Sequence, residues 1–286
     1  MDVKRIGFIG LGAMGLPMAK NLLKNGFGLH IVAHRNRGPV EELKQAGAIE
    51  ESSAAEIVSN CQVLISILPE DREMEAVLLS EEVLQQLKPG QVLIEMTSGS
   101  PDMMKKVNAV YQEKGARVLD APVSGGTIGA EKGTLTVMAG GDLELVETCG
   151  PVLNAMAENI YLVGAVGAGK AIKAINQMLA GIHMLASAEA IALAETLEID
   201  KEVIKEVIGK SSGSSWMLLN KADTLAKRDY TPGFKLSLMK KDIQIAINES
   251  AENNLPLASF ALNLFESAAT KDGELDFSAV GKKVLS

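Results

Sequence analysis

The stretch that decides the fold is "VKRIGFIGLGAMGLPMAKNLLKNG", residues 3–26. A strand-like run over residues 3–9 leads directly into a G-x-G-x-x-G motif, and a segment with helical spacing follows up to Gly26. Glycines let the backbone approach a pyrophosphate closely, and the amides of the next helix face the anion. This context favours a dinucleotide-binding motif over a glycine-rich turn without a ligand. The predicted cofactor-binding residues here are Gly10, Leu11, Gly12, Ala13, Met14 and Gly15.

The alternation of strands and helices continues beyond this motif. Strand-like segments recur at residues 29–34, 63–68, 92–96, 117–122 and 135–140. Helical segments lie between them at residues 72–79, 100–115 and 142–156. This alternation is typical of an α/β fold with a doubly wound, mostly parallel sheet, and it ends near Tyr161 and Leu162.

The second half of the chain shows helical patterns only. They cover residues 168–197, 200–210, 214–228, 235–254 and 256–273, and Asp200 and Pro256 stand where helix starts are expected. We therefore predict an N-terminal Rossmann-type domain, residues 1–163, and an all-α C-terminal domain, residues 164–286, that starts with a long interdomain helix. The cleft between the two domains is the expected place for chemistry.

Composition limits the classes of function. The 286 residues are 47% hydrophobic and 22% charged, which allows a sizeable core. A net charge of −8 and a pI of about 5.1 argue against nucleic acid or an anionic membrane as the main partner. Cys61 and Cys149 lack a CxxC context and the three histidines lack metal spacing, so we expect reduced core cysteines and no metal site. No signal peptide is visible, and we expect a cytoplasmic protein.

The residues after the second expected strand bear on the choice of dinucleotide. A carboxylate about 20 residues past the glycine motif would bind the ribose hydroxyls of NAD. No Asp or Glu lies between Gly26 and Glu41, and the loop carries His34, Arg35 and Arg37 instead. A guanidinium pairs well with a 2′-phosphate. We therefore predict NADP, with His34 and Arg35 in its site; if these charges are only solvated, NAD is possible too.

The long helix that opens the second half is polar at its start and apolar further on. One stripe along it contains Lys170, Lys173, Asn176, Gln177, Ala180, Met184, Ser187, Ala188 and Ile191. The opposite side contains Ile172, Ile175, Leu179 and Ile182. A solvated face would explain the polar start alone, but a stripe that becomes apolar predicts a helix buried along most of its length in a soluble protein. Burial and a second lysine nearby both lower a lysine pKa, which predicts a functional lysine at this end.

Four segments in this order resemble the β-hydroxyacid dehydrogenase family, which includes 3-hydroxyisobutyrate dehydrogenases, tartronate semialdehyde (2-hydroxy-3-oxopropionate) reductases and glyoxylate/succinic semialdehyde reductases. The resemblance covers nearly the whole chain. The segments are "GFIGLGAMGLPMAKNL" at 7–22, "DAPVSGGTIGAEKGTLTVMAGG" at 120–141, "GAGKAIKAINQ" at 167–177 and "LMKKDIQIA" at 238–246. The resemblance also implies a C-terminal domain like that of 6-phosphogluconate dehydrogenase.

The resemblance implies roles for the residues that match the family's motifs. Lys173, in a K-x-x-N pattern, looks like the catalytic lysine. The implied substrate-binding residues are Ser124, Gly125, Gly126, Asn176 and Gln177, although the glycine pair would also suit a plain turn. The implied cofactor contacts outside the glycine motif are Leu68, Pro69, Thr97, Ser98 and Lys241, of which Lys241 has an ordinary surface lysine as its alternative. Residues expected to shape the pocket are Ser214, Ser215, Trp216 and Asn220.

The activity that the resemblance implies is reversible hydride transfer between a nicotinamide and a small carboxylate substrate. That substrate would be a β-hydroxyacid or semialdehyde of the 3-hydroxyisobutyrate or 2-hydroxy-3-oxopropionate type, with Lys173 as acid and base. Two alternatives remain, an imine reductase and a non-catalytic dinucleotide-binding scaffold, and members of both kinds usually replace this lysine. Relatives form dimers or tetramers, and we expect a homodimer or homotetramer.

Lys170 departs from the family's pattern, because many relatives have an uncharged residue there. We expect its charge either to depress the pKa of Lys173 or to bind a second anionic group on the substrate.

Overall fold

The computed structural model describes residues 5–285. It divides into two compact units, one ending at Lys173 and the other beginning at Ala174. The first unit contains nine strands: β1 (Arg5–Ile9), β2 (Gly28–Val32), β3 (Ile49–Glu51), β4 (Val63–Ser66), β5 (Val92–Glu95), β6 (Arg117–Asp120), β7 (Val123–Ser124), β8 (Leu135–Gly140) and β9 (Ala157–Gly164). Its helices are α1 (Gly15–Lys24), α2 (Gly38–Gln45), α3 (Ala54–Asn60), α4 (Asp71–Leu78), α5 (Glu81–Gln86), α6 (Pro101–Glu113), α7 (Gly126–Lys132) and α8 (Leu143–Asn154).

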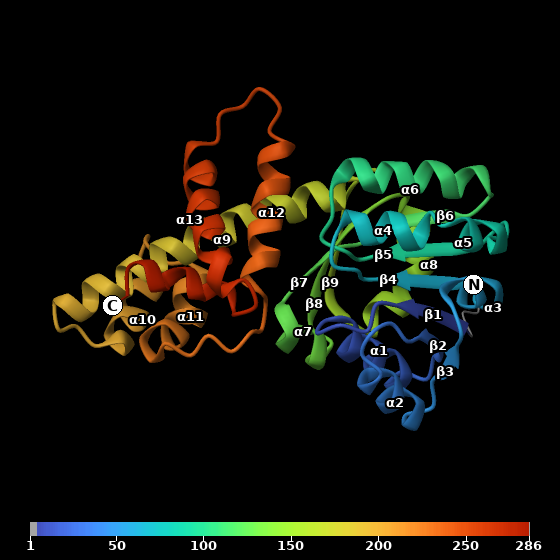
Figure 1. Cartoon of the computed structure of the whole chain (residues 1–286), viewed down its shortest axis with the longest axis horizontal. Coiled ribbons are helices and arrows are strands. Elements are labelled where there is room, and N and C mark those ends of the chain that lie inside the picture. Colours follow the sequence, from blue (N-terminus) through green and yellow to red (C-terminus); the bar gives the residue numbers. More distant parts are fainter. Residues whose placement is uncertain (1–4, 286) are drawn as a thin grey trace. The chain divides into compact units, whose positions relative to one another are not determined.

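The strand order of the sheet is β3-β2-β1-β4-β5-β6-β8-β7, and β9 pairs with β8 (Figure 1). The strands from β3 to β6 are parallel, whereas β8 runs antiparallel to β6 and β7. The order of these six parallel strands is that of doubly wound dinucleotide-binding folds, so the predicted fold class is confirmed. In such sheets the strand order reverses between β1 and β4, and ligands bind beyond the carboxyl ends of the strands there.

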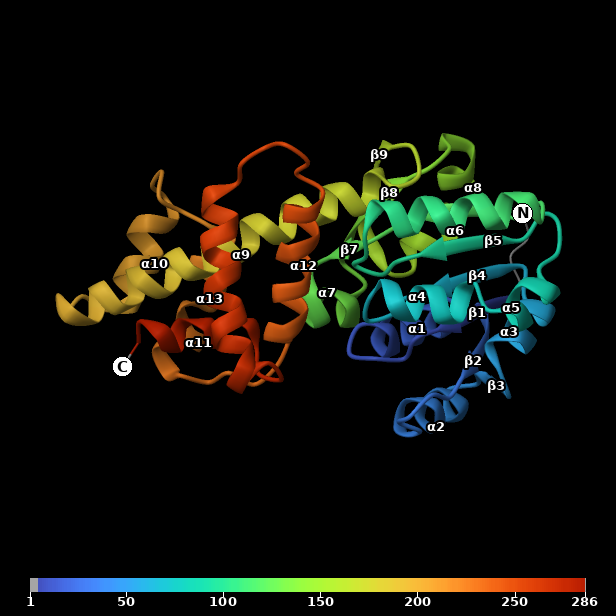
Figure 2. The ribbon, with the colours of Figure 1, turned by 45° about the horizontal axis from the view of Figure 1, so that its top comes forward.

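Side chains of the parallel strands alternate between two apolar clusters, one on each face of the sheet. In β4, Val63 and Ile65 join the cluster that contains Leu22 of α1. Leu64 points to the other face and joins the cluster that contains Met104 of α6. Figures 1 and 2 show α4 and α6 side by side over this second face. Helices on both faces explain why the strands read as nearly continuous apolar runs.

Sequence patterns did not reveal the shorter or more exposed elements. β3 has the sequence "IEE", which lacks an apolar alternation, and β7 has two residues. β9 was expected only as the point where the sheet ends, and most of its side chains are exposed. The missed helices are the short α2, α3, α5 and α7, together with a C-terminal 3₁₀ helix η1 (Phe277–Lys283).

The second unit contains helices around one apolar cluster. They are most of α9 (Ala168–Thr196), then α10 (Lys201–Gly209), α11 (Trp216–Lys227), α12 (Leu236–Asn248) and α13 (Pro256–Asp272). α12 and α13 lie side by side (Figure 1). Asp200 caps α10 by accepting a hydrogen bond from the Glu202 backbone, and Pro256 is the first residue of α13, as expected.

The stripe predicted along α9 is buried from Lys170 to Ile191, apart from the half-buried Asn176. The opposite side differs from the expectation, because Ile172, Ile175 and Leu179 are exposed. Within residues 5–285, α9 is also the helix whose length and hydropathy would suit a membrane span, with 44% of its most apolar window buried. Core helices of soluble proteins pass the same test.

Candidate active site

The three glycines of the motif have three different structural roles. Gly10 has a φ of +104°, and a Cβ there would lie 2.1 Å from the carbonyl oxygen of Ile67. A Cβ on Gly15 would lie 1.8 Å from the Gly10 carbonyl oxygen, so this glycine lets α1 pack closely on β1. A Cβ on Gly12 would meet nothing within 4 Å. The space over Gly12 is therefore open on the side where a pyrophosphate would lie.

The start of α1 suits an anion. Its first turn contains no acidic residue and its N-cap, Met14, provides no side-chain hydrogen bond. The first amides of a helix carry partial positive charge when nothing caps them. The residues of the motif therefore fit a dinucleotide.

Two of the segments implied as cofactor contacts are held together at the carboxyl ends of β4 and β5. The Leu68 backbone N–H donates to Thr97 Oγ1 at 2.8 Å, and Thr97 is fully buried. A second link follows, because the Ser100 backbone N–H donates to Asp71 Oδ1 at 2.9 Å. The segments that contain Leu68–Pro69 and Thr97–Ser98 are thus adjacent, beside the point between β1 and β4 where the strand order reverses.

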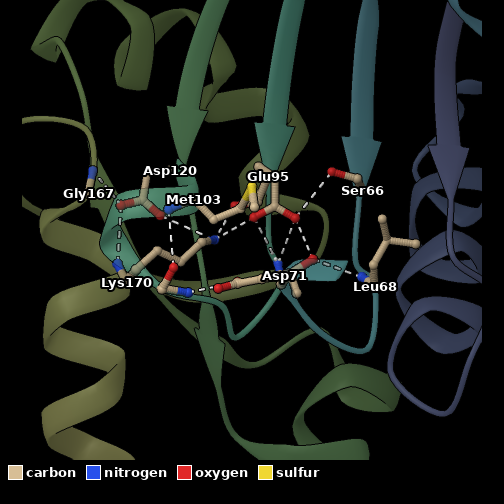
Figure 3. A network of polar contacts seen from close by, with 10 residues as sticks. Ser66, Leu68, Asp71, Glu95, Met103, Asp120, Gly167 and Lys170 are labelled. Carbon is tan, nitrogen blue, oxygen red and sulfur yellow. Dashed lines mark hydrogen bonds and ion pairs between the residues drawn. The ribbon is translucent and has the colours of Figure 1, made fainter. Parts of the chain in front are cut away.

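Glu95, the last residue of β5, is the centre of this polar network (Figure 3). Its carboxylate accepts hydrogen bonds from Ser66 Oγ at 3.3 Å and from both the hydroxyl and the backbone N–H of Thr97. On the other side, Lys170 Nζ lies 2.5 Å from Glu95 Oε2 and 3.3 Å from Asp120 Oδ1. All three charged side chains are 0% exposed. We call Lys170, Glu95 and Asp120 the Lys170 cluster.

Asp120, the last residue of β6, also holds the beginning of α9. Its Oδ2 accepts hydrogen bonds from the backbone N–H groups of Gly167, at 2.9 Å, and Lys170, at 3.1 Å. Asp120, at the end of β6, therefore caps the beginning of α9, and its negative charge compensates the helix dipole. Gly169 permits the close approach, since a Cβ there would lie 2.4 Å from the Met138 carbonyl oxygen. The "GAGK" segment is thus explained by packing.

The Lys170 cluster corrects two expectations. Burial lowers the pKa of Lys170, but the adjacent Glu95 and Asp120 carboxylates more than offset this, and its pKa lies above the usual value. The prediction of a lowered pKa at this end of the helix is therefore wrong for Lys170. The idea that Lys170 binds a second anionic group on the substrate is also wrong, because its ammonium has no exposure and faces two carboxylates of its own chain.

Lys173 lies one turn further along the same stripe of α9 and is 8% exposed. In the helical unit, the next turn carries Asn176, whose Nδ2 donates to Gln177 Oε1 at 3.0 Å. Gln177 Nε2 in turn donates to Asp242 Oδ2 at 2.8 Å. Asp242 is also paired with Lys241, with Nζ and Oδ1 3.0 Å apart. These side chains form one polar chain from α9 to α12. The Lys241 side chain is 16% exposed, which is less than expected for an ordinary surface lysine.

The implied carboxylate-binding loop joins β7 to α7. Ser124 is half-buried, and Gly125 and Gly126 are exposed. Both glycines have positive φ, +132° and +63°. A Cβ on Gly126 would meet nothing within 4 Å, so the backbone on this side is open.

The loop after β2 is exposed, including His34, Arg35 and Arg37. Arg37 is ion-paired with Glu41 of α2 at 2.8 Å and with Glu50 of β3 at 2.9 Å. These two carboxylates come from neighbouring elements, so the absence of Asp and Glu between Gly26 and Glu41 does not leave the loop free of negative charge. Arg35 is exposed in the same loop, and its role at a 2′-phosphate stays a prediction.

Sequence reasoning missed Glu95, Asp120 and Asp242 as parts of the site. The first two could have been found, because each is a carboxylate that ends an apolar strand, and the carboxyl ends of parallel strands meet at one edge. The residues expected to shape the pocket are placed at the start of α11. Ser215 caps this helix by accepting from the Leu218 backbone at 3.1 Å, and Trp216 is exposed.

Two family models together match nearly the whole chain. Residues 5–164 match the family described as the NAD-binding domain of 6-phosphogluconate dehydrogenase. Residues 167–284 match the family described as NAD-binding of NADP-dependent 3-hydroxyisobutyrate dehydrogenase.

Similar proteins agree with these matches. An NAD-dependent L-serine dehydrogenase of Pseudomonas aeruginosa is 38% identical over 98% of this chain and 97% of that protein. A 2-hydroxy-3-oxopropionate reductase of Escherichia coli is 34% identical over 96% of this chain and 95% of that protein. Among solved structures, a Mycobacterium tuberculosis 3-hydroxyisobutyrate dehydrogenase with L-serine is 32% identical, with a TM-score of 0.90 over 99% of this chain and 100% of that one.

Proposed function

This chain belongs to the β-hydroxyacid dehydrogenase family, and we propose that it interconverts small 3-hydroxy acids and their semialdehydes with NADP as the preferred cofactor and Lys173 as acid and base. It is an NAD(P)-dependent oxidoreductase that transfers hydride between its nicotinamide cofactor and a small hydroxy acid or the carbonyl compound formed from it. The observation that carries the catalytic role is the place of Lys173. This buried lysine lies one helical turn from Lys170, whose ammonium is fixed at the carboxyl end of β5.

The glycine motif and the first amides of α1 would hold the pyrophosphate of the cofactor. The adjacent segments at Leu68–Pro69 and Thr97–Ser98 would hold the rest, with His34 and Arg35 toward the 2′-phosphate and Lys241 as a further contact. When bound, the nicotinamide supplies the hydride donor or acceptor. Cofactor preference for NADP rests on the guanidinium of Arg35 in a loop without a carboxylate of its own.

Lys173 donates a proton to the substrate oxygen during reduction and accepts one during oxidation. The Ser124 hydroxyl and the backbone N–H groups of Gly125 and Gly126 bind the substrate carboxylate, and the open space beside Gly126 supports this role. Asn176 and Gln177 contact the rest of the substrate. A positioned acid and base of this kind contributes a factor of about 10²–10⁴ in rate.

The test is a steady-state assay of wild type and Lys173→Ala with NADPH and NADH. The substrate panel should include 3-hydroxyisobutyrate, L-serine and tartronate semialdehyde, with a cyclic imine to detect an imine reductase. We expect turnover with a 3-hydroxy acid or semialdehyde, lower KM for the phosphorylated cofactor, and a loss of about 10²-fold or more in kcat for Lys173→Ala with dinucleotide affinity kept. Turnover of the imine alone, or full activity of Lys173→Ala, would overturn the proposal.

We also propose that the protein is a cytoplasmic homodimer or homotetramer. Support comes from the apolar side of α9, where Ile175, Leu179 and Leu193 are exposed in the single chain. A monomeric mass by light scattering would contradict this.

A further inference from the structure

The Lys170 cluster carries an inference about how the site is assembled, and this inference rests on the proposed role of Lys173. We propose that Lys170 is a positioning residue, which fixes the first turn of α9 on the sheet and thereby places Lys173. Glu95 links the same ammonium to the segments that contain Leu68 and Thr97, so one buried carboxylate connects the catalytic helix to the cofactor segments.

Three contacts fix the beginning of α9. Asp120 accepts hydrogen bonds from the backbone of Gly167 and Lys170, Lys170 Nζ reaches Glu95, and Gly169 lies against the Met138 carbonyl. The backbone contacts set the position of the helix end, and the side-chain contact sets its rotation about its own axis. Lys173 follows at i+3 on the same stripe, so the same rotation determines where its amine points.

Stability alone explains the cluster poorly. One ammonium faces two carboxylates without any exposure, and a buried ion pair is often no more stabilising than apolar side chains of the same volume. The cluster also lies at the carboxyl ends of β5 and β6, the edge where this fold binds ligands. The position of the cluster and the free-energy cost of burying its charges both indicate a role in holding the site.

Glu95 makes two sets of contacts that different substitutions remove separately. The first is the ion pair with Lys170 of α9, and the second runs through the Thr97 hydroxyl to the Leu68 backbone N–H. Lys170→Met keeps most of the side-chain volume and removes the first set. Thr97→Val is nearly isosteric and removes the second set, while Glu95→Gln weakens both.

The experiment measures kcat with saturating substrates and the Kd of NADPH from its fluorescence on binding. Lys170→Met should lower kcat about 10- to 100-fold, because a displacement of about 1 Å at a reacting group costs that much, and should change Kd less than about threefold. Thr97→Val should instead raise Kd about tenfold, since the Leu68 N–H loses its acceptor, with a smaller effect on kcat than Lys170→Met. Glu95→Gln should change both.

Lys221→Met is the matched control, because Lys221 also pairs with a buried carboxylate, Asp276, in the helical unit. Lys221→Met should lower the melting temperature, but it should not lower kcat by a larger factor than it changes the Kd of NADPH. If Lys170→Met does not fold, the double variant Lys170→Met/Glu95→Gln replaces it. That variant removes one charge of each sign and leaves Asp120 with its two backbone donors.

Two outcomes would overturn the positioning role. One is a folded Lys170 variant with kcat unchanged, and the other is an equal loss of kcat and affinity in all variants that follows only their melting temperatures. Lys173→Ala, assayed in parallel, separates this inference from the proposed function. If Lys173→Ala keeps its turnover, the proposed function fails; if it loses turnover while Lys170→Met does not, the positioning role alone fails.

Discussion

Lys170 in the sheet unit and Lys221 in the helical unit both meet buried carboxylates, yet their surroundings differ. Lys221 Nζ lies 2.9 Å from Asp276 Oδ1 and 5.0 Å from the centre of the Phe277 ring, and its side chain is 18% exposed. Asp276 also accepts hydrogen bonds from four further donors, which are the backbone N–H groups of Gly233, Phe234 and Ser278 and the Ser278 hydroxyl. This carboxylate is satisfied several times over by neutral donors.

The Lys170 cluster has the opposite balance of charge. Its single ammonium serves two carboxylates, and the neutral donors are shared among segments that come from β4, β5 and the start of α9. Asp276 joins a loop to a short helix within one unit, which is a contribution to stability. The Lys170 cluster instead joins the segments that are predicted to bind the ligands. Buried charges that are hard to justify by stability are found at functional sites more often than elsewhere.

The largest expected effect is the difference in stability between Lys170→Met and Lys221→Met. Removing Lys170 leaves two buried carboxylates without their cation, which should cost about 3–5 kcal/mol in free energy of unfolding. Removing Lys221 leaves Asp276 with its other donors and should cost about 1–3 kcal/mol. Urea unfolding followed by far-UV circular dichroism measures both. Trp216, the single tryptophan, lies in α11 and reports on the helical unit.

Equal costs for the two variants would remove the contrast. A Lys170→Met protein as stable as wild type would show that the sheet tolerates its carboxylates without the ammonium, and the comparison would then have no basis in charge.

A smaller expected effect is that the stability contributed by each of the two clusters depends differently on pH. Burial raises the pKa of Asp276, but hydrogen bonds from Ser278 and the ion pair with Lys221 more than offset it, so its folded pKa lies below the usual value. A lowered folded pKa stabilises the protein above the unfolded pKa of about 3.9, and that contribution is lost as the pH falls through the folded value. The raised pKa of Lys170 has the opposite sign, because its contribution is present below about pH 10.4 and is lost at more alkaline pH.

Asp276→Asn should therefore cost about 1–3 kcal/mol at pH 7, and the difference from wild type should shrink as the pH falls below about 4. The cost of Lys170→Met should stay constant from about pH 7 to 9, where the lysine remains protonated. Unfolding free energies measured at each pH decide this. An Asp276→Asn difference that does not change in acid would mean that the carboxylate is not held ionised by its donors.

Part of this contrast was within reach of the sequence. The glycine motif and the apolar strand runs predicted the sheet, and the stripe on α9 placed a buried lysine at its polar end. Glu95 and Asp120 each close an apolar strand, but a sequence does not say which strands lie side by side. Lys170 was assigned to the substrate or to Lys173, because its partners lie 75 and 50 residues away along the chain. The contacts of Asp276 were not predicted, because Lys221 and the backbone of Gly233 and Phe234 lie 55, 43 and 42 residues away along the chain.

The smallest expected effect comes from an ion pair that is exposed to solvent. Lys106 and Glu75 form an ion pair of 2.5 Å between α6 and α4, with side chains 53% and 52% exposed. Lys106→Met should cost less than about 1 kcal/mol at low salt, and nothing measurable at about 1 M salt, where charges are screened within about 3 Å. The costs of Lys170→Met and Lys221→Met should change much less with salt, because ions cannot enter between buried partners. A salt series of urea unfolding on the three variants thus ranks the pairs by burial alone. If Lys170→Met lost its cost with salt as Lys106→Met does, water and ions would reach the cluster, and its rigid hold on α9 would fail with it.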